Sequence, residues 1–279
     1  MGFFFRLFLA SIARMSGTRL GFFFQKISYA VYRQSCNPGY KFYQNGELNL
    51  IDKLAGEMPS CNIVDVGANV GHWSIACAQK FGSQSVIFAF EPGDLTFKKL
   101  ESATKMMVNI VPLQVGFSDT NCSLNLVVNC RASEKSSVEQ VNLTELAVPA
   151  ASYQTESHDF VRGDEFFKGR GLRRINFLKI DTEGHDIKVL KGFSEMISDG
   201  RVDVIQFEYN RLNIVVKAML LDFYRLLNVE LTTNGYAIGR IYPKGVHFKS
   251  YQPSDENFID GNIVAIRLEL KALIDQLRC

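Results

Sequence analysis

The stretch that decides the fold is Asp65-Val66-Gly67-Ala68-Asn69-Val70-Gly71, where an apolar strand gives way to a glycine turn and then to a helix. Gly67 allows the backbone to turn tightly and a ligand to come close to it. The first turn of the helix that follows has N–H groups without helical partners, which favour a carboxylate or a phosphate. The stretch therefore predicts a ligand site at the junction of strand and helix.

An acidic residue follows the next apolar run. Glu91 stands twenty residues after Gly71, directly behind the strand expected over Ser85–Phe90. A carboxylate at that place can accept hydrogen bonds from both hydroxyls of a ribose. Together with Asp65 and the glycine turn, it indicates a cofactor that contains a nucleoside.

Two cofactors fit this layout. NAD normally requires G-x-G-x-x-G, and the third glycine of that pattern is missing here. Asp65, just before the turn, would repel a pyrophosphate, whereas its charge suits the amino group of a sulfonium amino acid. We therefore expect S-adenosylmethionine rather than NAD.

Apolar runs alternate with helical patterns from Glu47 onward. Strands are expected over Cys61–Val66, Ser85–Phe90, Asn109–Val115, Ile175–Ile180, Val202–Phe207, Tyr236–Ile241 and Asn262–Arg267, the last two joined by a long polar loop. Helical patterns follow the turn through Lys80 and cover Asp94–Ala103, Gly184–Met196 and Val215–Leu227. Such alternation predicts a doubly wound α/β fold, a mostly parallel sheet with helices on both faces.

Composition excludes several classes of protein. The chain has 279 residues, 47% of them hydrophobic, with 31 Lys and Arg against 29 Asp and Glu. These figures exclude a disordered chain, and the net charge of +2 argues against a general nucleic-acid binder. The six cysteines form no CxxC pair and no zinc-ligand pattern, so we expect a reducing, cytoplasmic location and no thiolate-bound metal.

Residues 1–46 differ from the rest of the chain. They contain six basic residues and no acidic one, and the apolar run from Phe3 to Ala13 is too short to span a membrane. A secretory signal and N-myristoylation are both disfavoured. Arg19, Lys26 and Arg33 recur every seven residues beside an aromatic helix face. This pattern predicts either peripheral contact of residues 1–34 with the inner face of a membrane or a helix packed on its own domain.

Five blocks of sequence resemble the FkbM-type S-adenosylmethionine-dependent methyltransferases. They are IVDVGANVGHWS (63–74), FAFEP (88–92), GFSD (116–119), FLKIDTEGHDIKVLKGF (177–193) and VIQFEYN (204–210). The resemblance implies a seven-stranded class I methyltransferase sheet with an antiparallel final strand. It also implies methyl transfer, mainly to hydroxyls of sugars, glycolipids and related natural products.

The resemblance assigns duties to individual residues as well. The cofactor-binding residues that it implies are Asp65, Gly67, Asn69, Gly71, Glu91, Pro92, Ser118, Asp119 and Asp181. Of these, the Asp65 turn would hold the methionine end, Glu91 the ribose, and Asp119 the adenine amino group. A turn or cap role suits Ser118 and Asp119 equally well.

The methyl acceptor is expected at the carboxyl end of the fourth strand, where open α/β sheets bind ligands. Asp181 is the first choice for the wall nearest the sulfonium, and His185 is the candidate base. For His185, a helix-start residue facing solvent is the alternative. Glu208 closes an apolar strand, so it completes the catalytic set, whereas Glu183 suits a helix cap. A divalent metal site formed by these four side chains is a minority alternative to the metal-free site that we expect.

Residues 116–165 interrupt the alternation of strands and helices. Leu124–Val128 is expected as an extra strand, in a hairpin with the strand before it, and Arg131–Glu156 as a substrate lid or a plain surface loop. Asp164 matches an acidic position of the family, but its preceding residue does not, which puts an acceptor role in doubt. The expected domains are a helical segment over 1–46 and a methyltransferase domain over 47–279.

The sequence thus favours an S-adenosylmethionine-dependent O-methyltransferase acting on a sugar, glycan, glycolipid or small-molecule hydroxyl. Two other classes stay open, an NAD-dependent oxidoreductase and a non-catalytic protein that keeps the cofactor fold. The glycine pattern disfavours the oxidoreductase. A non-catalytic protein would be expected to have lost site residues, and none is evidently lost. No nucleic-acid partner is expected, and the oligomeric state is left open.

Overall fold

The computed structural model describes residues 2–37, 41–129, 136–137, 153–231 and 235–279. The chain forms two compact units, Met1–Pro38 and Gly39–Cys279. The first unit is helical, and the second contains the sheets and the pocket described below.

The first unit consists of α1 (Phe3–Arg14) and α2 (Arg19–Ser35). Thr18 begins α2, because its Oγ1 accepts a hydrogen bond from the Gly21 N–H at 3.1 Å and donates one to the Met15 carbonyl at 2.6 Å. A Cβ on Gly21 would lie 2.1 Å from that same carbonyl oxygen. A residue larger than glycine therefore cannot occupy this corner. No helix in the described part of the chain is both long and apolar enough to cross a membrane.

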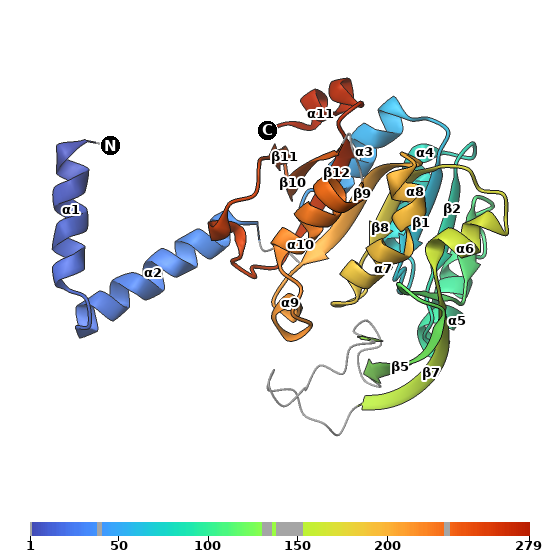
Figure 1. Ribbon diagram of the computed structural model, residues 1–279, viewed down its shortest axis with the longest axis horizontal. Helices are drawn as coiled ribbons and strands as arrows, with labels where there is room; N and C mark the ends of the chain where they lie inside the picture. The colour runs from blue at the N-terminus through green and yellow to red at the C-terminus, as the bar shows by residue number, and fades with distance from the viewer. Residues whose placement is uncertain (1, 38–40, 130–135, 138–152, 232–234) are drawn as a thin grey trace. The chain divides into compact units, whose positions relative to one another are not determined.

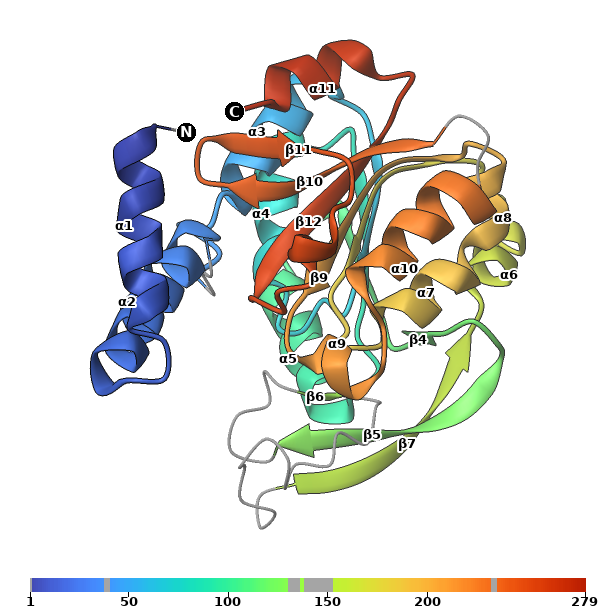
Figure 2. The same cartoon turned by 60° about the vertical axis from the view of Figure 1, so that its left-hand side comes forward.

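The main sheet of the second unit has eight strands in the order β11-β10-β12-β9-β8-β1-β2-β3 (Figures 1 and 2). They are β1 (Asn62–Val66), β2 (Val86–Phe90), β3 (Ile110–Leu113), β8 (Ile175–Ile180), β9 (Val202–Tyr209), β10 (Tyr236–Tyr242), β11 (Gly245–Phe248) and β12 (Gly261–Arg267). The five strands from β3 to β9 are parallel, and β12 runs antiparallel to β9. The predicted doubly wound class and the antiparallel final strand are confirmed.

The sheet is one strand wider than the predicted seven. The additional strand is β11, which lies in the stretch expected to be a polar loop and pairs with β10 at the edge of the sheet. Gly245 and Val246 pair with Tyr242 and Ile241 in a tight connection. The sequence prediction missed β11 because the strand has only four residues, which is too few for an alternation of apolar and polar residues to be recognised.

A second sheet has the order β4-β7-β5-β6. Its strands are β4 (Gly116–Phe117), β5 (Cys122–Asn129), β6 (Ser136–Ser137) and β7 (Tyr153–Val161). The predicted extra strand exists as β5, but its predicted hairpin with the preceding strand is wrong, because β5 pairs with β7 and β6 instead. Figure 2 shows the long β5–β7 pair extending away from the main sheet. Most of the predicted lid over Arg131–Glu156 lies outside the described residues.

Helices cover both faces of the main sheet and form two hydrophobic cores. On one face the core includes side chains of α3 (Glu47–Glu57), α4 (His72–Phe81), α5 (Asp94–Thr104) and α11 (Lys271–Leu277). On the other face it includes side chains of α6 (Gly163–Lys168), α7 (Asp186–Gly192), α8 (Ser194–Ser198), α10 (Leu220–Arg225) and the π-helical turn Leu226–Glu230. Successive strand residues alternate between the cores, so Ile63 and Phe177 contribute to the first and Val64 and Leu178 to the second.

Two predicted helices are interrupted. The pattern over Gly184–Met196 forms α7 and α8 with a break at Phe193, whose ring is fully buried. The pattern over Val215–Leu227 forms the end of α9 (Leu212–Val215), then α10 and the π-helical turn. A short 3-10 turn lies at Pro253–Asp255. The carboxyl ends of β1, β2, β8 and β9 meet at one edge of the sheet, as parallel strands require, and the pocket lies there.

Candidate functional site

The turn between β1 and α4 forms the floor of the pocket. The N–H groups of Gly67 and Ala68 donate to the Phe90 carbonyl at 3.0 and 2.8 Å, which ties the turn to the end of β2. Gly67 has φ of +78°, and a Cβ at this position would lie 2.0 Å from the Asp181 carbonyl oxygen. Asn69 also has positive φ, +52°. Position 67 thus requires glycine for two reasons, the left-handed backbone conformation and the close approach of the Asp181 carbonyl.

The N-terminus of α4 faces the same pocket. Gly71 precedes the helix with φ of +89°, and a Cβ there would lie 2.8 Å from a methyl carbon of Leu100. His72 and Trp73, the first residues of α4, line the pocket. The ten-residue helix therefore directs the N–H groups of its first turn and its positive dipole end toward this space.

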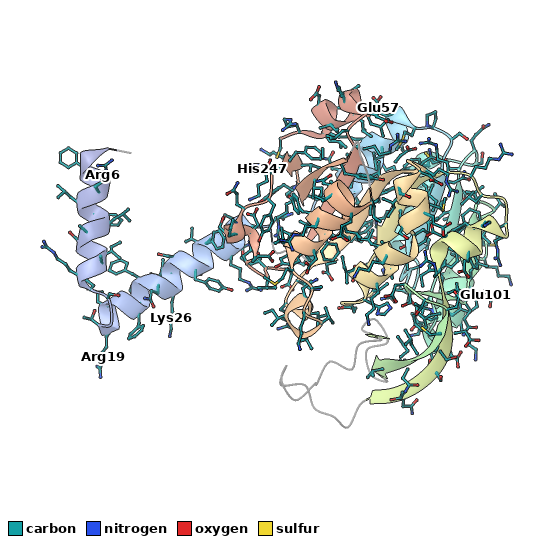
Figure 3. The ribbon with its side chains drawn as sticks, in the orientation of Figure 1. Arg6, Arg19, Lys26, Glu57, Glu101 and His247 are labelled. Atoms are coloured by element: carbon teal, nitrogen blue, oxygen red, sulfur yellow. The ribbon has the colours of Figure 1, made fainter. Side chains whose placement is uncertain are left out.

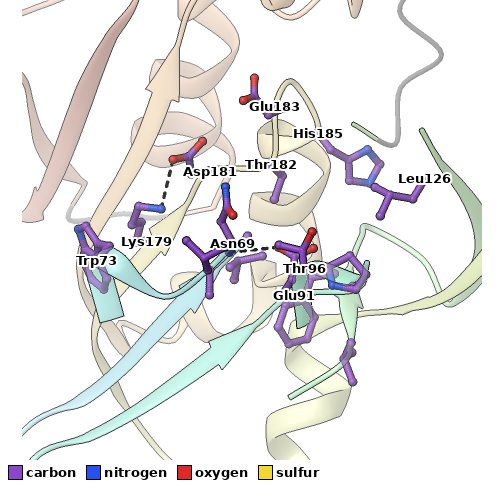
Figure 4. A pocket seen from close by; sticks show the side chains of 18 of the residues that line it. Asn69, Trp73, Glu91, Thr96, Leu126, Lys179, Asp181, Thr182, Glu183 and His185 are labelled. Carbon is purple, nitrogen blue, oxygen red and sulfur yellow. Dashed lines mark hydrogen bonds and ion pairs between the residues drawn. The ribbon is translucent and has the colours of Figure 1, made fainter. Parts of the chain in front are cut away.

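Glu91 is buried beside the turn. One of its carboxylate oxygens accepts a hydrogen bond from the Asn69 N–H at 3.1 Å, and the other accepts one from the Gly93 N–H at 3.0 Å (Figure 4). Burial raises the pKa of Glu91 to about 7, although these two hydrogen bonds oppose the shift. Glu91 and Pro92 both line the pocket. A buried carboxylate at the end of β2 is therefore available to a ligand with adjacent hydroxyls.

A buried ion network connects β1 with β8. Asp65 and Lys179 are direct partners in the register of the two strands, and both are buried. The Lys179 ammonium lies 3.3 Å from one Asp65 oxygen and 3.2 Å from one Asp181 oxygen, and it lies 5.7 Å from the centre of the Trp73 ring. Ser74 Oγ donates to the other Asp65 oxygen at 2.7 Å. Burial by itself lowers the pKa of Lys179, but Asp181, Asp65 and Glu47 together raise it above its usual value.

Asp65 therefore does not occupy the place that the sequence suggested. Its side chain is fully buried and is absent from the lining of the pocket, whereas Lys179 and Asp181 are part of it. Asp65 fixes Lys179, and Lys179 in turn fixes Asp181. The residue before the glycine turn acts on the pocket through another side chain.

The pocket has a volume of about 270 Å³. Six of the residues predicted from the sequence line it, namely Gly67, Asn69, Glu91, Pro92, Asp181 and His185. Asp65, Gly71, Ser118, Asp119 and Glu208 do not. In the view of Figure 4, Asn69 lies between Asp181 and Glu91, with Trp73 and Lys179 to one side and Leu126 and His185 to the other.

Glu47 lines the pocket and was not predicted. It is the first helical residue of α3, and its buried carboxylate accepts hydrogen bonds from the side-chain amides of Asn45 at 2.6 Å, Gln206 at 2.6 Å and Asn262 at 3.1 Å. Burial raises its pKa, and Lys179 opposes the shift. One sequence signal was available, because Gln206 is a polar residue near the end of the otherwise apolar run VIQF (204–207).

Trp73 was also missed. Its ring packs against Phe177 at 5.0 Å between centroids, and only 5% of the residue is exposed. Trp73 lines the pocket, and its indole N–H is buried and without a hydrogen-bond partner among the described residues. Buried indole N–H groups normally have partners, so this donor is suited to a polar ligand atom.

Ser118 and Asp119 follow β4. Ser118 is buried; its Oγ donates to an Asp119 oxygen at 3.1 Å and lies 3.0 Å from Nε2 of His185. The His185 ring also contacts the ring of Phe160, with 6.0 Å between centroids. His185 directly precedes α7, at the helix start that the sequence predicted, but the solvent-facing alternative is wrong because only 1% of the residue is exposed.

Glu208 is the next-to-last residue of β9, next to the end of β8. The register pairs Ile180 with Phe207, so Asp181 and Glu208 are the next residues on two neighbouring parallel strands. Asn210 donates its amide to a Glu208 oxygen at 2.6 Å. Burial raises the pKa of Glu208 well above its usual value, and the charges of Asp181 and Glu183 raise it further.

The minority alternative of a metal site is not supported. Within the described residues, the ligand atoms of Asp181, Glu183, His185 and Glu208 do not gather closely enough to hold one ion.

Asp186, which follows His185, accepts hydrogen bonds from Thr182 Oγ1 and the Gly184 N–H, both at 3.2 Å. Burial raises the pKa of Asp186 to about 7.

Asp164 supports a helix away from the pocket. Its two oxygens accept hydrogen bonds from the N–H groups of Glu195 and Met196, both at 2.9 Å, in the first turn of α8. Arg162 pairs with it at 3.1 Å. These contacts explain the acidic residue at this position without an acceptor role.

Comparison with known proteins assigns the chain to a family. Residues 65–234, more than half of the chain, match the family described as methyltransferase FkbM domain. The hexuronic acid methyltransferase AglP of Haloferax volcanii is 26% identical over 163 residues, covering 58% of this chain and 62% of that protein. The methyltransferase sdnD of Sordaria araneosa is 30% identical over 157 residues, covering 48% and 60%. The chain spans about three-fifths of the length of these curated relatives.

Solved structures of methyltransferases also align with the chain. A SAM-dependent methyltransferase from Aquifex aeolicus gives a TM-score of 0.42 at 9% identity, covering 85% of this chain and 98% of that one. Fibrillarin from Aeropyrum pernix, solved with S-adenosyl-L-methionine natively bound, gives 0.40 at 12% identity, covering 77% and 73%.

Proposed function

The chain belongs to the FkbM methyltransferase family, and we propose that it transfers a methyl group to a hydroxyl of a sugar, glycan or related small molecule. S-adenosylmethionine is the cofactor, and when bound it supplies an activated methyl group on a sulfonium. The observation that carries the proposal is the pocket in which Glu91 and Asp181 stand on either side of the β1–α4 turn.

The residues present fit this cofactor. Glu91 has a buried carboxylate positioned to accept hydrogen bonds from ribose hydroxyls. The first turn of α4 offers N–H groups, and Trp73 offers its indole N–H to a carboxylate. Asp181 offers a carboxylate to an ammonium group. A nucleoside joined to an amino acid presents these groups together.

Asp181 and Glu208 are the side chains that we propose for the acceptor. A hydroxyl is a weak nucleophile, so the chain must orient it and accept or share its proton. Asp181 lines the pocket and is held by Lys179. Glu208 is its neighbour on β9, just outside the pocket lining, and its raised pKa favours a carboxyl that takes up a proton from that side.

His185 keeps a part in the proposal, but on the cofactor side of the pocket. Its contact with Ser118 connects it to the segment after β3, which the resemblance assigns to adenine, and its contact with Phe160 connects it to β7. These contacts favour a role for His185 in the wall of the adenine site over the role of catalytic base that the sequence predicted. Substitution of His185 by Gln is therefore expected to weaken cofactor binding more than it slows methyl transfer.

A sugar hydroxyl is the acceptor class that we favour. One curated relative is named a hexuronic acid methyltransferase, and it is 26% identical to this chain over 163 residues. Aromatic side chains also line the pocket, among them Phe42 and Trp73. Aromatic faces beside hydrogen-bonding groups suit the apolar and polar faces of a sugar ring.

Cofactor binding is tested by thermal unfolding with S-adenosylhomocysteine, with NAD and with neither. S-adenosylhomocysteine at about 100 times its Kd is expected to raise the free energy of unfolding by about 2.7 kcal/mol, and NAD is expected to have no effect. Stabilisation by NAD alone would replace the proposal with the oxidoreductase alternative.

Acceptor class is tested by transfer of labelled methyl groups from S-adenosylmethionine. The acceptors are a glucuronic acid oligosaccharide, a neutral oligosaccharide and a catechol, with analysis of the methylated atom. Label on a sugar oxygen is expected. Stabilisation by S-adenosylhomocysteine without transfer to any acceptor would favour the non-catalytic alternative, and label on the catechol alone would reject the sugar.

A further inference from the structure

The two helices of the first unit expose apolar and aromatic side chains to an unusual degree. Eleven of the twenty large hydrophobic residues exposed in the described chain lie between positions 4 and 32. Phe23 is 56% exposed, Ile27 45% and Val31 65%. Monomeric soluble proteins rarely expose so many neighbouring apolar residues, so this concentration marks an interaction surface.

These side chains follow the period of a helix. Leu20, Phe23, Ile27 and Val31 are spaced by three or four residues and share one face of α2. The adjacent face carries Arg19, Lys26 and Arg33, spaced by seven. Helix α2 is therefore amphipathic, with its cations bordering the apolar face rather than standing opposite to it.

Helix α1 has the same character. Leu7 and Phe8 are half exposed, and the helix also carries the basic residues Arg6 and Arg14, the latter on the same side as Leu7. Figure 3 shows the labelled Arg6, Arg19 and Lys26 side chains extending from the two helices. The whole stretch over 1–46 contains six basic residues and no acidic one. A partner must therefore present negative charge next to an apolar layer.

We propose that residues 3–35 bind flat on an anionic lipid bilayer. Long Lys and Arg side chains at the edge of an apolar helix face can reach the headgroups while the aromatic residues enter the boundary with the acyl chains. Charge complementarity favours a lipid surface, because it supplies negative charge and an apolar layer together. Neither helix crosses the bilayer in this arrangement.

The corner between the helices supports a surface role as well. Thr18 caps α2, and Gly21 allows the close approach to Met15 that closes the corner. Both helices are thus defined before any partner binds. Binding then costs less ordering entropy than it would for a segment that folds only on the membrane.

The test uses the full chain in co-sedimentation with vesicles. Vesicles of phosphatidylcholine with added phosphatidylglycerol are expected to bind the protein, and vesicles of phosphatidylcholine alone are expected to bind it much less. Added salt is expected to release the protein, because the attraction to the surface is screened. Equal binding to both kinds of vesicle, or none to either, would overturn the proposal.

Two variants probe the two faces of α2. Phe23→Ser with Ile27→Ser removes apolar contact, and Arg19→Glu with Lys26→Glu reverses charge; each is expected to weaken binding to anionic vesicles by more than about tenfold. The matched controls lie in the second unit, Met106→Ser with Val108→Ser and Lys98→Glu with Lys105→Glu, all at exposed positions. They are expected to leave vesicle binding unchanged.

Two readouts separate lipid binding from misfolding and from self-association. Stabilisation by S-adenosylhomocysteine, measured on every variant, reports that the second unit is folded and does not depend on membranes. Light scattering without lipid reports self-association. If the Phe23 and Ile27 variant dissociates an oligomer and leaves vesicle binding unchanged, the surface binds a second copy and the lipid proposal is wrong.

Discussion

Glu91 keeps a carboxylate where burial favours the neutral form. Its pKa of about 7 lies within the physiological range, so its charge depends on pH when the pocket is empty. A ribose donates hydrogen bonds to the ionised form. We expect the affinity for S-adenosylhomocysteine to fall by about tenfold for each pH unit below 7, as measured by calorimetry.

The control for this prediction is Glu91→Gln. Glutamine cannot ionise, so the variant is expected to bind more weakly than the native chain at pH above 7 and to show little dependence on pH. A native affinity that is constant from about pH 5.5 to about pH 8 would show that Glu91 does not set it.

Lys179 compensates the buried charge of Asp65. Substitution by Met removes the cation and leaves Asp65 fully buried, so we expect a loss of about 3–5 kcal/mol in the free energy of unfolding. Lys80→Met is the matched control, since Lys80 pairs with Asp52 at the surface and its loss is expected to cost about 1 kcal/mol or less. Urea unfolding measures both.

A double variant identifies the cause. Asp65→Asn with Lys179→Met removes both charges, and it is expected to recover part of the stability that Lys179→Met alone loses. If the two single losses add without any recovery, the ion pair is not the reason for the effect of Lys179→Met.

The residues near the glycine turn could be predicted because their signals are local. Gly67 and Glu91 each stand at the end of an apolar run, and the structure puts both in the pocket. The roles of Glu47 and Lys179 could not be predicted, because they depend on which strands and helices become neighbours. Gln206, which donates to Glu47, is 159 positions away in the chain.

Among the elements, the β1–α4 turn is tightly constrained by its surroundings. Gly67→Ala places a methyl group against the Asp181 carbonyl and forces a positive φ on an alanine. We expect a loss of about 2–5 kcal/mol and of S-adenosylhomocysteine binding. Gly171→Ala is the matched control, with φ of +70° and open space around its Cβ, and it is expected to cost about 1–2 kcal/mol. Equal losses in thermal unfolding would show that the carbonyl contact is unimportant.

Asp164 provides a contrasting case at the start of α8. Asp164→Ala leaves two buried N–H groups without acceptors, so we expect a loss of about 1–3 kcal/mol. The affinity of the remaining folded protein for S-adenosylhomocysteine is expected to stay unchanged. A weaker affinity with unchanged stability would return Asp164 to the functional site.

Elements with a long periodic signal could be predicted, and short ones could not. The strand over Ile175–Ile180 has the predicted bounds, because most of its six residues are apolar and its side chains are buried on both faces of the sheet. Strand β5 was predicted with the wrong partner, since its partner β7 begins more than twenty residues later. Phe193 ends α7 because its ring belongs to the core, a tertiary effect that helical periodicity does not contain.

At the scale of the whole molecule, carboxyls with raised pKa values set the dependence of stability on pH, among them Glu47, Asp164 and Glu208. The pKa values of Glu91 and Asp186 are raised to about 7, above their ordinary values of 4.5 and 3.8. Between those values and 7 the folded state binds more protons than the unfolded state. The free energy of unfolding of the ligand-free chain is therefore expected to fall from about pH 5 to pH 7.

Thermal unfolding at about pH 5.5 and about pH 7.5 measures this difference. Glu91→Gln with Asp186→Asn is expected to reduce it, because neither side chain then takes up a proton. A native chain that is more stable at the higher pH would contradict the raised pKa values. The expected trend is opposite to that of cofactor affinity, so the ligand-bound chain should vary less with pH.

The contact between Gly67 and the Asp181 carbonyl has a consequence for how such enzymes diversify. The β1–α4 turn and the strand end that we propose for the acceptor side are in close backbone contact at Gly67, so a change in one is expected to disturb the other. New acceptor preferences are then expected to arise from changes away from the contact between Gly67 and Asp181, such as changes in the segment after β9 or in the β5–β7 pair. Engineering of the acceptor range should therefore begin in those segments and leave Gly67 and Asp181 unchanged.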